Sequence, residues 1–108
     1  MAITPAKVQF EPGAQIDYIG ALEYYETEAN SPELADRFDA AIQKAASAIS
    51  VAPRLWRITE GPDVRRYVIQ RFPYVVYYRY ELAAQLVIVY AIVHTSRQPD
   101  YWRGRIPS

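Results

Sequence analysis

The apolar positions in the first half of the chain follow a helical spacing in two segments. Residues 14–29 carry an apolar stripe with members three to four positions apart, and residues 34–52 repeat that spacing over a longer segment. This period is typical of helices with one buried face. Between the stripes, Ser31 and Pro32 suit the N-cap and first position of the second helix, and Pro53 ends that helix. Because both stripes are rich in alanine, we expect two closely packed antiparallel helices.

Strand patterns occupy the rest of the chain. Residues 7–10 alternate apolar and polar positions, and a loop is expected over residues 54–63. β-Branched and aromatic residues then predict three strands, at residues 64–72, 75–81 and 86–93. The predicted order is β-α-α-β-β-β. This is an α+β fold in which a helical hairpin packs on a small, mainly antiparallel sheet, as one domain over residues 1–108.

These patterns predict a core between the helix pair and the sheet. Its expected members are Leu22, Tyr25, Phe38, Ile42, Ile49, Val68, Val76, Ile88 and Ala91. The acidic residues of the first helix lie mostly off its apolar stripe. We therefore expect a solvated face, without metal-ligand spacing, made by Asp17, Glu23, Glu26 and Glu28.

The composition excludes several kinds of site. The chain has no Cys, which excludes disulfides and thiolate ligands, and its one His excludes a multi-histidine metal site within the chain. We accordingly expect no metal and no cofactor. No apolar run approaches the roughly 20 residues of a membrane helix, and the first residues lack the pattern of a signal peptide. The sequence therefore predicts a cytoplasmic protein.

The neutral overall charge hides an asymmetry. The 12 basic and 12 acidic residues balance, but residues 1–52 hold three basic and eight acidic residues, whereas residues 53–108 hold nine basic and four acidic ones. Every basic residue in the second half is Arg, which binds carboxylates and phosphates in a forked geometry. The second half is therefore suited to an acidic partner or nucleic acid, unless these charges are ordinary solvated ones.

Four segments form a recognisable pattern by their order and spacing. They are Tyr24-Tyr25 at the end of the first helix; Phe38 to Ile49, followed by Pro53 and Trp56; Val64-Arg65-Arg66 with Arg71-Phe72-Pro73-Tyr74 and Tyr77-Tyr78; and His94-Thr95-Ser96-Arg97-Gln98-Pro99 followed by Tyr101-Trp102. Together they cover about residues 7 to 103 and resemble the RelE/ParE superfamily of bacterial toxins from type II toxin–antitoxin modules. The resemblance implies a growth-inhibiting, plasmid-stabilising toxin domain that a cognate antitoxin neutralises.

Two activities occur in the resembled superfamily. RelE-like members are ribosome-dependent mRNA interferases that need no metal, and ParE-like members act on DNA gyrase. In the RelE-like nucleases an Arg typically follows the aromatic residue that opens the strand after the hairpin turn, and here the matching position is Val75. That substitution, together with the neutral net charge, favours the ParE-like branch, because ribosome binding relies on phosphate contacts. An inactive module that only binds antitoxin is a third possibility.

If the chain were a nuclease, the resemblance would supply its catalytic candidates. These are Arg66, Arg71, His94, Arg97 and Tyr101. Metal-free RNA cleavage needs cationic donors and an acid/base pair, and either Arg71 or Arg79 could replace the missing central Arg. Two ordinary readings compete with these roles: His94 as a strand-end residue satisfied by nearby backbone, and Arg97 as an ion-pair partner of Glu60, Asp63 or Asp100.

A binding surface is the alternative to a catalytic site. We expect its members to be Arg65, Arg71, Arg79, Arg97 and Trp102. In an unbroken strand Arg65 and Arg71 would share one side, because side chains alternate with a period of two. The expected partners are the antitoxin and DNA gyrase, with the ribosome and mRNA as the alternative. A homodimer or a hetero-oligomer with the antitoxin is also open.

Overall fold

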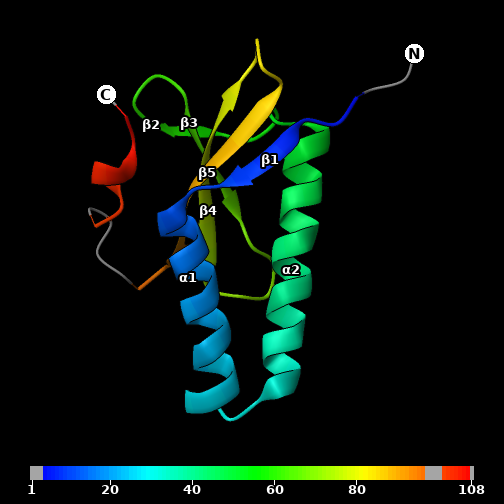
Figure 1. The fold of residues 1–108 in the computed structure, drawn as a ribbon, viewed down its shortest axis with the longest axis vertical. Coiled ribbons are helices and arrows are strands. Elements are labelled where there is room, and N and C mark those ends of the chain that lie inside the picture. Colours follow the sequence, from blue (N-terminus) through cyan, green and yellow to red (C-terminus); the bar gives the residue numbers. More distant parts are fainter. Residues whose placement is uncertain (1–3, 97–100, 108) are drawn as a thin grey trace.

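The computed structural model describes residues 4–96 and 101–107. Two helices pack on one face of a five-stranded sheet, and the C-terminal segment lies next to the start of the first helix (Figure 1). The helices and strands are β1 (Lys7–Phe10), α1 (Pro12–Glu23), the π-helical turn η1 (Tyr24–Glu28), α2 (Pro32–Val51), β2 (Ile58–Glu60), β3 (Val64–Val68), β4 (Tyr74–Glu81), β5 (Leu86–His94) and the 3₁₀ turn η2 (Arg103–Arg105). The α+β class is confirmed. No helix in these ranges is long and apolar enough to cross a membrane.

The strand order across the sheet is β1-β5-β4-β3-β2. β1 pairs in parallel with β5, and every other neighbouring pair is antiparallel. The expected order lacked one strand, because the segment predicted as a loop contains β2. This strand has three residues at the sheet edge, which is too short to show an alternating pattern in the sequence.

The start of α2 follows the predicted capping. The Ser31 hydroxyl accepts a hydrogen bond from the Leu34 N–H at 3.2 Å, and Pro32 occupies the first turn. A Ser cap satisfies one of the N–H groups that a helix start leaves unpaired. The helix ends at Val51, two residues before Pro53, as expected. α1 does not end in the same way: it continues directly into the π-helical turn η1, and the chain then leaves the helix near Asn30, which has a φ of 48°.

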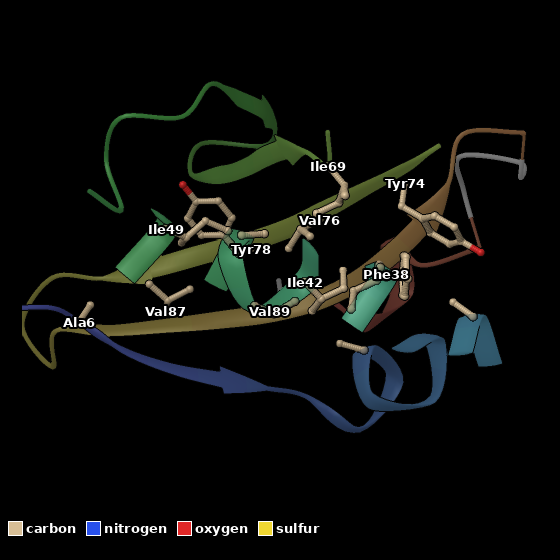
Figure 2. Close-up of a cluster of buried hydrophobic side chains, with 14 residues drawn as sticks. Ala6, Phe38, Ile42, Ile49, Ile69, Tyr74, Val76, Tyr78, Val87 and Val89 are labelled. Carbon is tan, nitrogen blue, oxygen red and sulfur yellow. The ribbon is translucent and has the colours of Figure 1, made fainter. Parts of the chain in front are cut away.

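The main core lies between the helices and the sheet. Phe38, Ile42 and Ile49 of α2 point toward the strands and pack with Val76 and Tyr78 (Figure 2). Burial of such side chains removes apolar surface from water and is the dominant stabilising effect. The predicted core residues Phe38, Ile42, Ile49 and Val76 are confirmed as buried.

Other core predictions need correction. Leu22, Tyr25 and Ile88 are only half-buried, and Val68 is 55% exposed because β3 ends there, on the face away from the helices. Ala91 is buried, but in a second cluster on that opposite face. The strand predicted to reach residue 72 stops at Val68, and the chain then turns through residues with irregular backbone.

A β-bulge in β5 explains the position of Ala91. Tyr77 pairs with Ala91 and Tyr78 pairs with Val89, so Tyr90 is an additional residue without a partner in the ladder. Such an insertion changes which face the following residues occupy. Ile92 therefore returns to the helix side of the sheet, whereas Ala91 lies on the opposite side.

The second cluster attaches the C-terminal segment to the far face of the sheet. Trp102 stacks on Tyr77 with 4.0 Å between ring centroids and 20° between ring planes. Val64, Ala91 and Val93 complete this cluster. A stacked aromatic pair of this kind adds roughly 0.5–1.5 kcal/mol beyond the burial of its surface.

Candidate functional site

Two of the nuclease candidates lie on opposite sides of the sheet. Arg66 is in β3 and pairs across the ladder with Tyr77, which belongs to the far-face cluster. Arg71 lies in the turn between β3 and β4, where it borders a groove against α2 on the helix side. The structure therefore does not bring Arg66 and Arg71 together around one reacting group.

His94 is engaged by its own neighbourhood. Its ring lies 5.1 Å from the Tyr74 ring in an edge-on arrangement. The Ser96 N–H donates to His94 Nδ1 at 3.1 Å, and the Ser96 hydroxyl lies 2.7 Å from the same nitrogen. These contacts match the interpretation of His94 as a strand-end residue whose ring is satisfied by the following turn.

The remaining candidates lie near the C-terminus. Arg97 and Asp100 are outside the described residues. The Tyr101 side chain is partly exposed, with the Arg105 guanidinium 5.3 Å from its ring centroid. Trp102 is only 1% exposed, so its indole forms part of the core. This position corrects the expectation that Trp102 contributes to a binding surface.

Val75 is buried at the position that the resemblance matches to a nuclease arginine. It is 4% exposed and pairs with Val68 on one side and Val93 on the other. A valine offers no hydrogen-bond donor for the charge that builds on a phosphorane. The strand therefore supplies no cation at this point.

Two arginines expected on a binding surface, Arg65 and Arg79, have partners within the fold instead. The Arg65 guanidinium donates to the carbonyls of Arg54 and Trp56 at 3.1 and 2.7 Å, which fixes the segment before β2. Arg79 forms an ion pair of 3.0 Å with Asp63. Arg65 and Arg71 do not share a strand, because β3 ends before Arg71. The expectation that Arg65 and Arg71 share one side of a strand is therefore wrong.

Other charged residues also have structural partners. Glu60 accepts from Arg103 at 2.6 Å, so both Glu60 and Asp63 are already paired with residues other than Arg97. Asp17, expected on a solvated face, accepts from the Ile92 N–H at 3.0 Å and from Arg105. The sequence pattern missed this role because both partners lie more than 70 positions further along the chain.

The tyrosines with shifted pKa values are not suited to proton transfer near neutral pH. Burial and a hydrogen bond to Asp39 raise the pKa of Tyr18 to about 12. Burial raises the pKa of Tyr78 as well, and its hydroxyl donates to the Pro53 carbonyl at 2.8 Å. General acid/base groups work best when their pKa lies near the operating pH.

Within residues 4–96 and 101–107 there is also no cluster of three His, Cys, Asp or Glu side chains for a metal.

An open groove of about 500 Å³ separates α2 from the turn between β3 and β4. It is lined by Leu34, Arg37, Ala40, Ala41, Lys44, Tyr67, Gln70, Arg71 and Phe72. Three of these residues are cations, and none is acidic. Of the three, only Arg71 was expected from the sequence to belong to a site. Arg37 and Lys44 could have been found from their spacing. They are seven residues apart, which places them on the same side of a helix and separated by about two turns.

Comparisons with known proteins agree with the observed fold and with the resemblance of the sequence to the RelE/ParE superfamily. The family model described as "ParE toxin of type II toxin-antitoxin system, parDE" matches residues 8–99. A search of curated protein sequences finds no significant match.

Two solved structures are similar to this chain. One, from the chromosomal ParDE toxin–antitoxin system of P. aeruginosa, has a TM-score of 0.73 at 17% identity and covers 86% of this chain and 99% of its own. The other, from the RelBE2 toxin–antitoxin complex of Mycobacterium tuberculosis, has a TM-score of 0.61 at 17% identity and covers 89% of this chain and 98% of its own. These structures show the same fold, and the family model spans most of the sequence. The chain therefore belongs to the ParE toxin family of type II toxin–antitoxin systems.

Proposed function

We propose that this protein arrests growth by binding a macromolecular target, DNA gyrase, and that a cognate antitoxin neutralises it. The proposal is that inhibition comes from occupying a surface of the target and not from catalytic turnover. Membership of the ParE family supports the gyrase target. The two similar structures come from a ParDE system and a RelBE2 complex, which supports an antitoxin partner.

The separation of the nuclease candidates carries the proposal. Arg66 and Arg71 lie on different sides of the sheet, His94 is engaged by Ser96, and Val75 is buried without a donor. Metal-free RNA cleavage requires its donors and its acid/base pair to be preorganised around one phosphate. These residues do not form such a site, so a binding mechanism accounts for the arrangement better than an interferase mechanism does.

A supercoiling assay with purified gyrase tests the proposal. We expect the wild-type chain to inhibit supercoiling of relaxed plasmid, and the purified toxin–antitoxin complex to leave it unaffected. The control is the Phe38→Ala variant, which should be destabilised because Phe38 is fully buried and should therefore inhibit less. Growth arrest without any effect on gyrase would overturn the gyrase target. A well-folded chain that neither arrests growth nor inhibits gyrase would indicate an inactive module.

A role of Arg97 in target binding stays a prediction, because Arg97 lies outside the described residues. If Arg97 contacts the target, the Arg97→Glu variant should lose growth arrest while keeping its thermal stability. The measurement is colony survival after induction together with a melting curve of the purified variant. Full growth arrest by a folded Arg97→Glu chain would remove this residue from the target-binding surface.

A further inference from the structure

The outer face of α1 is apolar although it is exposed to solvent. Ile16 and Ile19 are 69% and 56% exposed, and Gly20 beside them is also exposed. Residues 12–22 contain a single charged residue, Asp17, and its carboxylate is bound within the fold. A helix that is apolar on all sides is normally covered on all sides. The outer face of α1 therefore has the composition of a contact surface.

The neighbouring helix has an ordinary outer face. Most exposed positions of α2 carry polar or charged side chains, namely Glu33, Asp36, Arg37, Asp39, Gln43, Lys44 and Ser47. Single exposed apolar residues are common on protein surfaces and need no explanation. Ile16 and Ile19 differ from that case, because they lie about one helical turn apart on the same side of α1 and form one continuous apolar strip.

Gly20 is unexplained by the fold of one chain. A glycine inside a helix lowers helix stability relative to alanine. A Cβ atom at Gly20 would meet nothing within 4 Å, and the residue does not have a positive φ. Neither crowding nor backbone conformation within the chain requires glycine here. On an outer face, a residue without a side chain allows a second helix to approach closely, because the distance between packed helices depends on the side chains at their contact.

The acidic residues of the first helical segment lie at its unfavourable end. The first turn of α1 contains no acidic residue, and Glu11 before it makes no capping hydrogen bond. Glu23, Glu26 and Glu28 lie at the other end, where the last turns contain no basic residue. Among the residues that the structure describes, these three carboxylates have no ion-pair partner. Carboxylates stabilise a helix at its start and not at its end.

We propose that the outer face of α1 binds a second copy of this chain, with the two α1 helices packed antiparallel about a two-fold axis. The axis passes between Ile16 and Ile19, so that Ile16 of each copy contacts Ile19 of the other. The same symmetry sets Glu23 opposite Pro12 of the other copy, where the unpaired N–H groups of a helix start lie. A contact of this kind uses one self-complementary surface twice.

The distribution of charge favours a second copy over an unrelated partner. The helix start that lacks acidic residues and the helix end that has an excess belong to the same surface, so each complements the other when that surface meets itself. In Figure 1, α1 continues beyond the sheet to the tip of the helical hairpin. An antiparallel copy can therefore lie along α1 with its own sheet at the opposite end.

The contact should be weak. The exposed face of one short helix is smaller than the roughly 800 Å² per partner that a stable interface buries. We expect half of the protein to be dimeric at roughly 10–100 µM, in the range of transient interfaces. This inference goes beyond the proposed function and does not depend on it, because neither gyrase nor the antitoxin takes part in the contact.

Sedimentation velocity of the purified chain, from about 1 to about 500 µM, tests the inference. We expect monomer at the lowest concentration and mainly dimer at the highest. Ile16→Glu should stay monomeric throughout, and its melting temperature at low concentration should be unchanged, because Ile16 is exposed in the monomer. Leu55→Glu is the matched control. Leu55 is 70% exposed and lies outside α1, so this variant should dimerise like the wild type.

Two further variants distinguish close helix packing from nonspecific apolar association. Gly20→Leu adds apolar surface but holds the two helices apart, so it should weaken dimerisation at least about tenfold. Nonspecific association would become stronger instead. Glu23→Lys should weaken the dimer about threefold or more and raise the melting temperature of the monomer, because a cation suits the end of its own helix.

Single cysteines test the orientation of the two copies, since the chain has no Cys of its own. Ile19→Cys should form an intermolecular disulfide on mild oxidation, because Ile19 lies close to the proposed axis. Glu23→Cys should not, because antiparallel packing separates the two copies of this residue by about 16 Å along the helix axis.

The outcomes decide the inference separately from the proposed function. A chain that stays monomeric at every concentration would overturn the inference, even if that chain inhibits gyrase. Equal dimerisation by Ile16→Glu and Leu55→Glu, or stronger dimerisation by Gly20→Leu, would also overturn it. Ready disulfide formation by Glu23→Cys would contradict the antiparallel arrangement. A dimer lost in Ile16→Glu and retained in Leu55→Glu would support the contact, whether or not the chain acts on gyrase.

Discussion

Asp17 of α1 and Arg105 near the C-terminus form an ion pair with two hydrogen bonds. Arg105 Nη1 lies 2.8 Å from Asp17 Oδ2, and Nη2 lies 3.3 Å from Oδ1. The Asp17 side chain is 10% exposed. Nη1 of Arg105 also donates to the Tyr90 carbonyl at 3.1 Å, beside the bulge in β5. This pair connects the first helix, the central sheet and the C-terminal segment.

We expect substitution of Asp17 to destabilise the fold. Asp17→Ala leaves both the Arg105 charge and the Ile92 N–H without their acceptor, and should lower the free energy of unfolding by about 2–4 kcal/mol. Asp17→Asn keeps an acceptor and should cost less. Urea denaturation of both variants measures the difference. An exposed control on the same helix, Glu23→Ala, should change stability by less than about 0.5 kcal/mol.

Gly13 has a separate relationship with Arg105. A Cβ atom at Gly13 would lie 2.7 Å from Arg105 Nε, so Gly13→Ala should displace the arginine and destabilise the wild-type chain. In an Arg105→Ala background that clash is absent, and alanine should stabilise the helix by up to about 1 kcal/mol. A double-mutant cycle of thermal or urea unfolding measures the coupling. Additive effects of the two substitutions would contradict the close approach.

Two apolar substitutions test the core. Phe38 is fully buried, and Phe38→Ala should reduce stability by about 3–5 kcal/mol. Val68 is 55% exposed, and Val68→Ala should cost less than about 0.5 kcal/mol. Melting curves of the two purified variants make the comparison. Similar losses in both variants would contradict the exposed position of Val68.

Stability should fall at high pH because of buried tyrosines. Burial raises the pKa of Tyr18 to about 12, with a contribution from its hydrogen bond to Asp39. The unfolded chain loses its tyrosine protons near the ordinary pKa of about 10, so stability is fully present below that value. It is lost progressively between about pH 10 and 12. Tyr18→Phe should reduce this slope, as measured by urea unfolding across the pH series. An unchanged slope would show that the Tyr18 proton is not involved.

The features of the fold that repeat along the sequence could be predicted, and isolated features could not. The stripe of α2, its Ser31-Pro32 start and the apolar run of β5 each span several residues with one period, and all three are confirmed. β2 is too short to show a period. β3 ends at Val68, and Arg71 in the following turn has a positive φ; the residue types indicate neither feature.

The candidate site was predicted less completely than the fold. Sequence spacing suggested that Arg65 and Arg71 share a face, but this required a strand that does not continue. Trp102 was predicted to belong to a binding surface because it is aromatic, whereas in the structure its ring stacks on Tyr77. Arg37 and Lys44 were overlooked because each alone is an ordinary exposed helix residue. They line a groove only because the turn that carries Arg71, more than 20 residues further along the chain, lies opposite them.

The central claim is inhibition by binding without cleavage, and mapping of transcript 5′ ends in cells tests it most directly. Transcripts are sequenced shortly after induction of the wild-type chain and of the His94→Ala variant. We expect both to arrest growth with no cleavage phased to codons, because no proton transfer is required. Codon-phased cleavage in the wild type that disappears in His94→Ala would contradict the account and establish a ribosome-dependent nuclease.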